Sequence, residues 1–245
     1  MTGKSIDVIE VCPVCGKPSL GTVNVGALAG VTVKLECDCS RDEEGDKREE
    51  AQRLEKAYAK CFGIKGFVPR TFADDDGANA EASKLAKHYA ERFGDLEFGL
   101  LMFGDTDQGK TFLSECIAAA LIAQGYSVVM RSVPDIVRLA QQNGFEDWMQ
   151  PLMACDLLIL DDLGAERTTE FAQEAVYAVV DGRYRRKKKT LVSTNLTRVE
   201  LQSPGNITSN RIYSRLLERC LPFELKSGRS RSTRERFDSF REQLS

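Results

Sequence analysis

Histidine is almost absent from this chain of 245 residues, which contains only His88. A single histidine excludes a metal centre built from several histidine ligands. The segment around His88 is rich in charge, which favours a surface position over membership of a Ser-His-Asp triad. The sequence therefore gives no support for either of these two kinds of catalytic site.

Long apolar runs are also missing. No uninterrupted apolar stretch approaches the roughly 20 residues that a membrane-spanning helix needs, and the first residues, MTGKSIDVIE, lack the apolar segment of a secretory signal. We therefore expect a cytoplasmic protein without a membrane partner. The formal net charge is −3, which argues against polyanion binding by the whole surface, so any nucleic-acid contact has to be local.

Glycine, lysine and threonine follow an apolar run near the middle of the chain. The run Leu100–Phe103 is typical of a buried parallel strand. The glycines, lysine and threonine of residues 104–111 then have the spacing of a Walker A phosphate-binding loop. Apolar residues recur at helical spacing over 111–124, which predicts a helix directly after the loop. Strand, loop and helix in this order predict a nucleotide site.

The residue types of this loop suit the chemistry of a triphosphate. Backbone N–H groups of the loop and the first helical turn would contact phosphates, where the helix dipole favours negative charge. The Lys110 ammonium would neutralise the β and γ oxygens, and the Thr111 hydroxyl would bind Mg²⁺. The residues expected to bind ATP are Gly104, Asp105, Thr106, Asp107, Gln108, Gly109, Lys110 and Thr111.

A second apolar run ends in two acids, Asp161 and Asp162, which is the form of a Walker B element. Unbroken aliphatic residues suit a strand that is buried on both faces, and ligands bind beyond the C-terminal ends of such strands in open parallel sheets. We expect Asp161 to contact the nucleotide through Mg²⁺. We expect Asp162 to orient or deprotonate the attacking water, a role that many related ATPases give to glutamate.

A third strand, residues 190–195, ends in Asn195. An amide at the tip of this strand can form a hydrogen bond to the attacking water or the γ-phosphate, as a sensor-1 asparagine does. The preceding segment, residues 181–189, holds six cations. They could contact nucleic-acid phosphates, but lysine and arginine are also favoured at a helix C-terminus by its dipole. The sequence supports both interpretations equally.

Four of the eight cysteines are paired near the N-terminus. Cys12 and Cys15 form a C-x2-C pair, and Cys37 and Cys39 form a tighter C-x-C pair. Four thiolates at such spacings can hold Zn²⁺ tetrahedrally, and free thiols or a redox pair are the alternative. The other cysteines are isolated, and Cys116 lies on an apolar helical face, which favours a place in the core.

The region between the cysteine pairs and the phosphate loop predicts a small module and a linker. Residues 22–35 mix β-branched residues with glycines, as a short hairpin does. A charged helix follows with a narrow apolar stripe, which suits a connector, a partner-binding face or a solvated helix packed on its own domain; the stripe is Leu54, Ala57, Tyr58 and Cys61. Glycines and a proline in 63–69 predict a linker. We expect a zinc-binding module over 1–62 and an ATPase domain over 63–245.

Aromatic residues precede the phosphate-loop strand at Phe67 and Phe72. In nucleotide-binding α/β domains this stretch often packs against the adenine base, so either ring is a candidate wall. For each ring taken separately, a place in the core is favoured.

These motifs together resemble the DnaC/DnaI-type bacterial helicase loaders, which are AAA+ ATPases. The resemblance covers roughly residues 65–235 and rests on the Walker A loop, LLILDDLGAE, STN, the helix RIYSRLLE and the ending ELK-x4-R. It implies an α/β fold with a parallel sheet flanked by helices, preceded by the zinc-binding module. It also implies that Arg215 enters the nucleotide site of a neighbouring subunit, and that Arg231 is a sensor-2 residue at ATP.

The resemblance implies an ATP-dependent loader of the replicative DNA helicase. Its cofactors would be ATP, Mg²⁺ and Zn²⁺, and its partners the helicase, single-stranded DNA and further copies of the chain. N-terminal cysteine modules occur in loaders of the DnaI kind, where they grip the helicase. The nearest alternative is a transposition helper ATPase of the IstB kind, which usually lacks such a module. A small-molecule kinase would need a lid, and Arg211, Arg215 and Arg231 are better explained by sensing and subunit contact.

Two residues depart from the usual pattern. Asp107 stands where the loop G-x-x-G-x-G-K has its second glycine. Aspartate tolerates a left-handed backbone better than most residues, so the loop can form, but its charge near the phosphates lowers the expected nucleotide affinity. Asp162 replaces the usual glutamate, which predicts slow hydrolysis, as in a switch rather than a motor.

Overall fold

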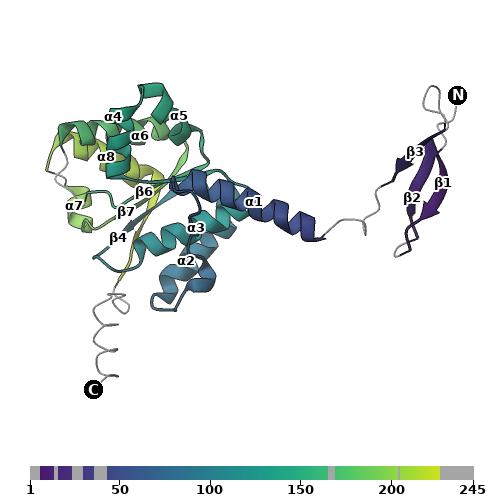
Figure 1. Cartoon of the computed structure of the whole chain (residues 1–245). Coiled ribbons are helices and arrows are strands. Elements are labelled where there is room, and N and C mark those ends of the chain that lie inside the picture. Colours follow the sequence, from purple (N-terminus) through teal and green to yellow (C-terminus); the bar gives the residue numbers. More distant parts are fainter. Residues whose placement is uncertain are drawn as a thin grey trace, which may run out of the picture. The chain divides into compact units, whose positions relative to one another are not determined.

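The computed structural model describes residues 6–13, 16–23, 30–35, 43–164, 169–203 and 205–226. The chain divides into two compact units, Met1–Arg53 and Leu54–Ser245, which can be followed by colour in Figure 1. The division falls inside helix α1, Glu43–Phe62. In the described part of the chain, no helix is long and apolar enough to cross a membrane.

The first unit contains a three-stranded antiparallel sheet in the order β1-β2-β3. Its strands are β1, Ile6–Val11, β2, Pro18–Val23, and β3, Val31–Lys34. β2 and β3 form the hairpin that residues 22–35 predicted, whereas β1 was not predicted. Directly after β1, the Cys12 amide donates to Lys17 O at 2.8 Å and Gly16 N donates to Cys12 O at 2.9 Å, which forms a tight turn.

The second unit is built on a five-stranded sheet in the order β5-β6-β7-β4-β8, and every recorded strand pair in it is parallel. The strands are β4, Gly99–Phe103, β5, Val128–Ser132, β6, Leu157–Asp161, β7, Lys189–Thr194, and β8, Cys220–Glu224. The strand before the phosphate loop and the strand before the two acids are not neighbours, because β7 pairs with both. Since parallel strands end at one edge of a sheet, the loops after β4, β6 and β7 meet there.

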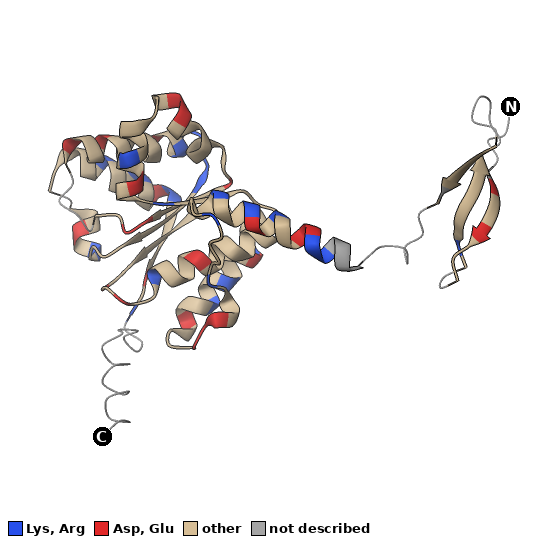
Figure 2. Ribbon diagram, viewed as in Figure 1, with Lys and Arg blue, Asp and Glu red and all other residues tan. Residues whose placement is uncertain are grey.

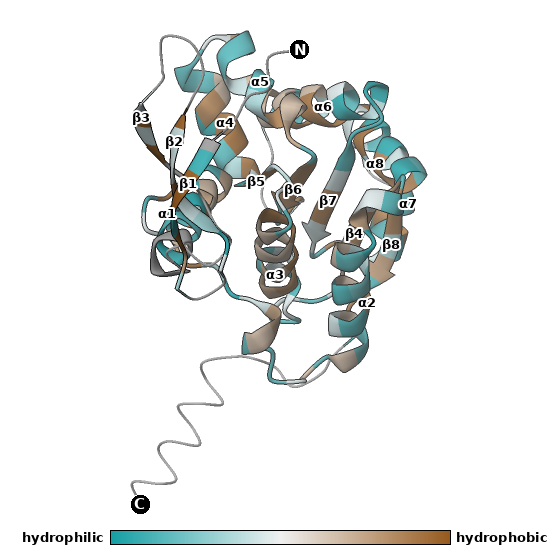
Figure 3. Cartoon of the chain, turned by 90° about the vertical axis from the view of Figure 1, so that its right-hand side faces the viewer, coloured by the Kyte–Doolittle hydropathy of each residue, from teal (hydrophilic) through white to brown (hydrophobic). Residues whose placement is uncertain are grey.

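Helices cover both faces of this sheet (Figure 1). Alternate strand residues face two apolar clusters, so Leu101 and Phe103 of β4 belong to one cluster and Leu100 and Met102 to the other. The first cluster packs under α4, Val133–Gln142, α5, Phe145–Ala154, α6, Glu170–Arg185, and α8, Ile207–Arg219. The second packs under α2, Ala80–Glu91, and α3, Lys110–Ala123, and α3 is strongly apolar in Figure 3. Short helices are η2, Phe72–Asp74, η3, Phe93–Asp95, and α7, Arg198–Gln202.

The apolar stripe of α1 packs on the second cluster. Cys61 is fully buried, and the other three stripe residues, Leu54, Ala57 and Tyr58, pack against the same cluster. Arg131 of β5 donates to Cys61 O at 2.5 Å, at the last turn of the helix. Elsewhere on α1, charges of both signs alternate (Figure 2). The stripe is therefore buried against the second unit.

Candidate functional site

The predicted phosphate loop joins β4 to α3 and requires unusual backbone angles. Gly104 has φ 142°, Gly109 has φ 88° and Asp107 has φ 62°. A Cβ atom at Gly104 would lie 2.5 Å from Leu225 O, so no larger residue fits there. Asp107 adopts the left-handed backbone in place of the usual glycine, as the sequence predicted.

Lys110 is the first residue of α3 and is buried. Its Nζ donates to Gly104 O at 2.8 Å and to Asp105 O at 2.6 Å, so the ammonium lies over the loop. Burial lowers the pKa of Lys110, while the negative charges of Asp162 and other nearby acids oppose this shift. Lys110 is thus a cation among carboxylates at the end of the sheet.

Thr111 and Asp161 lie together, as the magnesium prediction requires. The Thr111 hydroxyl donates to Asp161 Oδ2 at 3.0 Å, with Oδ1 at 3.3 Å. Burial raises the pKa of Asp161, and hydrogen bonds from Ser193 and Thr111 oppose that rise. A carboxylate beside a hydroxyl is a set of hard oxygen donors of the kind that Mg²⁺ prefers, so these residues fit the ion.

The end of β7 holds the two acids at the end of β6, of which Asp161 is the last strand residue and Asp162 the next. Asn195 Nδ2 donates to Asp162 Oδ1 at 2.8 Å, which places the predicted sensor asparagine beside the predicted catalytic acid. Ser193 Oγ donates to Asp161 Oδ1 at 2.5 Å and accepts from the Asp162 amide at 2.8 Å. Sequence reasoning missed Ser193, although its position two residues before Asn195 places both side chains on one side of the strand.

Arg215 contacts its own chain instead of the nucleotide edge. Its Nη2 lies 2.7 Å from Asp181 Oδ1 of α6, and its side chain is 23% exposed. The guanidinium lies over the Tyr177 ring, 5.0 Å from the centroid, and 5.5 Å from that of Tyr184. The other predicted sensing residue, Arg231, lies outside the described residues. The role of Arg215 in a neighbouring subunit stays a prediction.

Most cations of the segment 181–189 are used inside the second unit. Arg183 is fully buried and donates to one hydroxyl and several carbonyl groups, including Thr190 Oγ1, Leu152 O, Cys155 O and Lys189 O. Lys189 donates to Phe93 O and lies 3.8 Å from the centroid of that ring. Arg185 pairs with Asp181 at 2.7 Å. These contacts favour the structural interpretation of the cluster over the nucleic-acid interpretation.

A contact that sequence reasoning missed fixes the segment before β4. The Arg70 side chain forms two hydrogen bonds to Glu115, Nε to Oε2 at 3.0 Å and Nη2 to Oε1 at 2.8 Å, and the Arg70 backbone N–H donates a third to Oε2 at 3.2 Å. Glu115 lies one turn after Thr111 on α3. The pair therefore ties this segment to the helix that begins the nucleotide site. No local pattern could have revealed it, because the partners lie 45 residues apart.

The aromatic residues before β4 contact protein groups. Phe67 stacks on Phe62 with centroids 4.4 Å apart. Phe72 packs against the second cluster, and the Lys87 ammonium lies 5.7 Å from its ring centroid. Both rings are half-buried. Phe72 packs on the core, and contact of either ring with adenine stays a prediction.

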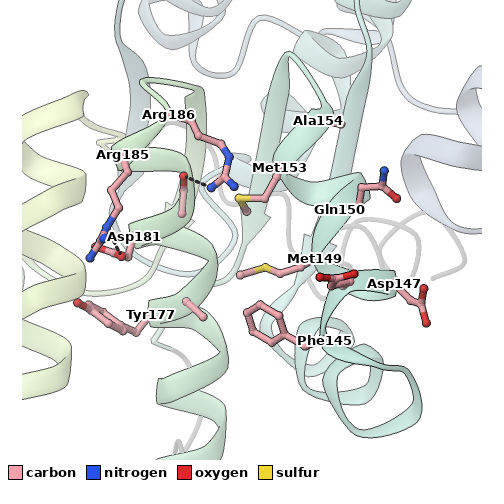
Figure 4. Close-up of a pocket in the computed structure, with 13 residues that line it drawn as sticks. Phe145, Asp147, Met149, Gln150, Met153, Ala154, Tyr177, Asp181, Arg185 and Arg186 are labelled. Carbon is pink, nitrogen blue, oxygen red and sulfur yellow. Dashed lines mark hydrogen bonds and ion pairs between the residues drawn. The ribbon is translucent and has the colours of Figure 1, made fainter.

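A pocket of about 970 Å³ lies between α5 and α6, away from the phosphate loop. Phe145, Met149 and Met153 line one side, and Tyr177 and Asp181 line the other (Figure 4). None of residues 104–111 lines it. This pocket is therefore not the nucleotide site. It shares Asp181 with the Arg215 cluster, which consists of Arg215, Asp181, Tyr177 and Tyr184.

The described cysteines of the second unit are part of the core. Cys61, Cys116 and Cys220 are buried, and burial raises the pKa of each thiol to about 12. Such thiols stay protonated near neutral pH and are poor nucleophiles. The prediction that Cys116 is a core residue is confirmed, and His88 is exposed as expected.

Three of the four predicted zinc ligands, Cys15, Cys37 and Cys39, lie outside the described residues. Cys12 is described and buried. Among the residues that the structure describes, no three or more His, Cys, Asp or Glu side chains form a cluster that could hold a metal ion. The zinc site therefore stays a prediction.

Comparison with known proteins identifies a family and several similar proteins. The family described as IstB-like ATP binding protein matches residues 46–236. The replicative helicase loader DnaI of Bacillus subtilis is 28% identical over 141 residues, which cover 52% of this chain and 45% of DnaI. The match thus spans less than half the length of that relative.

Two solved structures of helicase-loader proteins have a similar fold. The crystal structure of DnaI gives a TM-score of 0.54 at 22% identity and covers 64% of this chain and 91% of that chain. The crystal structure of the DnaC helicase loader gives a TM-score of 0.53 at 19% identity and covers 70% and 99%. At these identities the likeness establishes the fold of the second unit.

Proposed function

Because the chain belongs to the IstB-like ATP-binding family, we propose that it is an ATP-dependent assembly factor that loads a replicative DNA helicase. ATP binding follows from the family. Hydrolysis of ATP, contact with the helicase and contact with single-stranded DNA are the further content of the proposal. Likeness to the loaders DnaI and DnaC supports the choice of partner.

The observation that carries the proposal is the meeting of three chain segments at one edge of the sheet. Thr111 contacts Asp161, and Asn195 contacts Asp162. Preorganised groups of this kind need little rearrangement when the substrate binds, which is a large part of phosphoryl-transfer catalysis. The site is therefore suited to an ATP-dependent step.

Each residue has a distinct task in the proposed reaction. Thr111 and Asp161 would hold Mg²⁺, which when bound neutralises the phosphate oxygens. Lys110 would move from the loop carbonyls to the phosphates. Asn195 holds one oxygen of Asp162, so the other oxygen would accept the proton of the attacking water. Because aspartate is one methylene shorter than glutamate, Asp162 reaches less far, and we expect slow hydrolysis that serves as a switch.

A binding experiment with two alternative partners, a helicase and a transposase, tests the function directly. The chain is mixed with its cognate replicative helicase, with and without ATP and single-stranded DNA, and the mass of the complex is measured. We expect an ATP-dependent complex with the helicase, and no such complex with a transposase. The reverse result would favour a transposition helper ATPase, the alternative that the family description itself suggests. Lys110→Ala serves as the control that cannot respond to ATP.

The N-terminal module is proposed to hold zinc and to contact the helicase. The backbone hydrogen bonds from Cys12 N to Lys17 O and from Gly16 N to Cys12 O support this, because they bring Gly16 and Lys17 back to Cys12, the first of the four predicted ligands. The family match begins at residue 46, so the cysteines lie outside it. The module is thus an addition to the family core, which favours a loader over the transposition helper.

Elemental analysis tests the zinc site. Protein purified anaerobically without added metal should contain about one zinc per chain, by the four-ligand rule. The double change of Cys12 and Cys15 to Ser should remove the zinc and leave the cooperative melting of the second unit intact. Cys116→Ala is the matched control, because it removes a thiol elsewhere and should retain zinc. A content below about 0.2 zinc per chain in the unchanged protein would contradict the four-ligand site.

A further inference from the structure

Ser193 is the one side chain of β7 that contacts both residues of the acid pair. It is 1% exposed and lies on the strand that separates β4 from β6. Its hydroxyl hydrogen is donated to Asp161 Oδ1 at 2.5 Å, and its oxygen accepts the Asp162 amide hydrogen at 2.8 Å. Both hydrogen-bonding functions of the hydroxyl are therefore used on the acid pair.

The backbone of Ser193 continues the same attachment. Leu163 N donates to Ser193 O at 2.8 Å. One residue of β7 thus holds three successive residues of the neighbouring turn, 161 to 163. Within this turn Asp162 has φ 59°, a left-handed conformation that is uncommon for non-glycine residues, although aspartate tolerates it better than most.

We propose that Ser193 is a positioning residue for the Mg²⁺–nucleotide site, acting through Asp161. The inference rests on the proposed function, since it requires that Thr111 and Asp161 receive Mg²⁺ with ATP. Thr111 lies nearer to Oδ2 of Asp161, and Ser193 holds Oδ1. Bonds to both oxygens fix the rotation of the carboxylate, so that it faces the ion instead of turning toward a different partner.

The rival partner is the Lys110 ammonium. Lys110 directly precedes Thr111, whose hydroxyl lies 3.0 Å from Asp161 Oδ2, and its ammonium lies over the phosphate loop. Without the Ser193 hydroxyl, the carboxylate could rotate and pair with that ammonium, which would occupy both the magnesium ligand and the phosphate-binding cation. Loss of a group that orients a metal ligand typically lowers metal affinity about tenfold to a hundredfold. The effect on nucleotide binding without metal should be much smaller.

Thr190 provides a matched comparison on the same strand. It is also buried, at 7% exposure, and its hydroxyl accepts from Arg183 Nε at 3.2 Å. It lies at the opposite end of β7 and contacts neither acid in the recorded hydrogen bonds. Thr190→Val therefore removes a buried hydroxyl of β7 without disturbing the acid pair.

The experiment measures binding of a fluorescent ATP analogue to the full chain, first in EDTA and then across a Mg²⁺ titration. For Ser193→Ala we expect affinity in EDTA within about twofold of the unchanged protein, and a Mg²⁺ midpoint raised about tenfold or more. Thr190→Val should leave the midpoint unchanged. In the double variant with Asp161→Asn, loss of Ser193 should have no further effect, because the two residues act as a unit.

Each contrary result has its own meaning. An unchanged Mg²⁺ midpoint in Ser193→Ala, or an equal loss of affinity in EDTA, would overturn the positioning role. Ser193→Cys, a weak donor at the same place, should shift the midpoint in the same direction. If both variants lose the cooperative melt, Ser193 serves the fold and the proposal is wrong. If the unchanged protein binds nucleotide without any dependence on Mg²⁺, the proposed ATPase function itself fails.

Discussion

The sequence predicts ATP chemistry at two described places. One is the nucleotide edge, where β4, β6 and β7 end, and the other is the Arg215 cluster on α6 and α8. The two differ in what their side chains contact. At the edge, the predicted residues contact one another, Thr111 with Asp161 and Asn195 with Asp162. On α6 and α8, Arg215 contacts Asp181 of its own chain instead. A side chain that acts within its own chain contacts its functional partners in a single subunit. A side chain that acts on a neighbouring subunit contacts other residues when that subunit is not described.

The resting place of Arg215 is compatible with release. The side chains of this ion pair are only 23% and 14% exposed, so breaking it costs more than the roughly 1 kcal/mol of an exposed pair, and a cation over an aromatic ring adds roughly 0.5–1 kcal/mol. A subunit interface can offset a cost of that size. The contact with Asp181 therefore does not exclude a role in a neighbouring subunit, and the predictions below test it against the self-contained edge, from the largest expected effect to the smallest.

Arg215→Ala should have the largest effect. If Arg215 completes a neighbour's site, ATPase activity with helicase or single-stranded DNA present should fall about 10³-fold, because a cation at the transition state is lost. ATP affinity, measured by nucleotide titration, should stay near that of the unchanged protein. The unchanged protein's specific activity should also rise with its concentration, and the variant should lose this rise.

A mixture decides whether Arg215 works across subunits. Lys110→Ala subunits retain Arg215, and Arg215→Ala subunits retain an intact phosphate loop, so mixed interfaces should restore part of the activity. The control is each variant alone at the same total concentration. If the mixture stays inactive although both variants co-assemble, Arg215 serves only its own chain, and the contrast between the two regions disappears.

Asp162→Asn should act inside the edge and separate catalysis from binding. Loss of the proton acceptor should lower hydrolysis about 10²-fold or more, while the amide keeps the shape of the side chain and spares Asp161. ATP binding should persist. Asp156→Asn, just before the start of the same strand, is the matched control and should leave hydrolysis unchanged. Loss of binding equal to that of Lys110→Ala would mean that the two acids are assigned in the wrong order.

Lys110→Ala should lower ATP affinity by at least about tenfold, or roughly 1.4 kcal/mol, because a charge-assisted contact with the phosphates is lost. Calorimetric titration with ATP measures the change. Lys87→Ala, an exposed lysine of α2, is the control and should bind ATP normally. Unchanged affinity in Lys110→Ala would show that the ammonium stays on the loop carbonyls in the bound state.

Asp181→Asn should have the smallest effect and sharpen the contrast. It removes the charge that Arg215 and Arg185 share, so the free energy of unfolding should fall by about 1 kcal/mol or more, because the pair with Arg215 is mostly buried. Denaturant titration measures this change. ATP affinity should not change, because Asp181 makes none of the recorded contacts of the edge. A loss of ATP affinity would show that the two regions are coupled within one chain.

The sequence by itself determined the elements that depend on neighbouring residues. The loop 104–111 is continuous in the chain, and unbroken apolar runs such as Leu157–Leu160 are sufficient to specify buried strands. The resemblance to helicase loaders, read from the same motifs, is confirmed by the comparisons. Helix α5 was missed because Pro151 lies inside it and interrupts a helical pattern in sequence, while packing of Trp148 and Leu152 on the first cluster compensates.

Only the tertiary structure decided which distant side chains meet. The strand order places β7 between β4 and β6, and this is why Ser193 contacts the acid pair. Burial of Arg183 and the pairing of Arg70 with Glu115 likewise join segments far apart in the chain. Residue type fixes what a side chain can do, but charge pairing and burial act through space. The sequence alone therefore does not distinguish an arginine that holds a strand, as Arg183 does, from one that holds a helix, as Arg70 does.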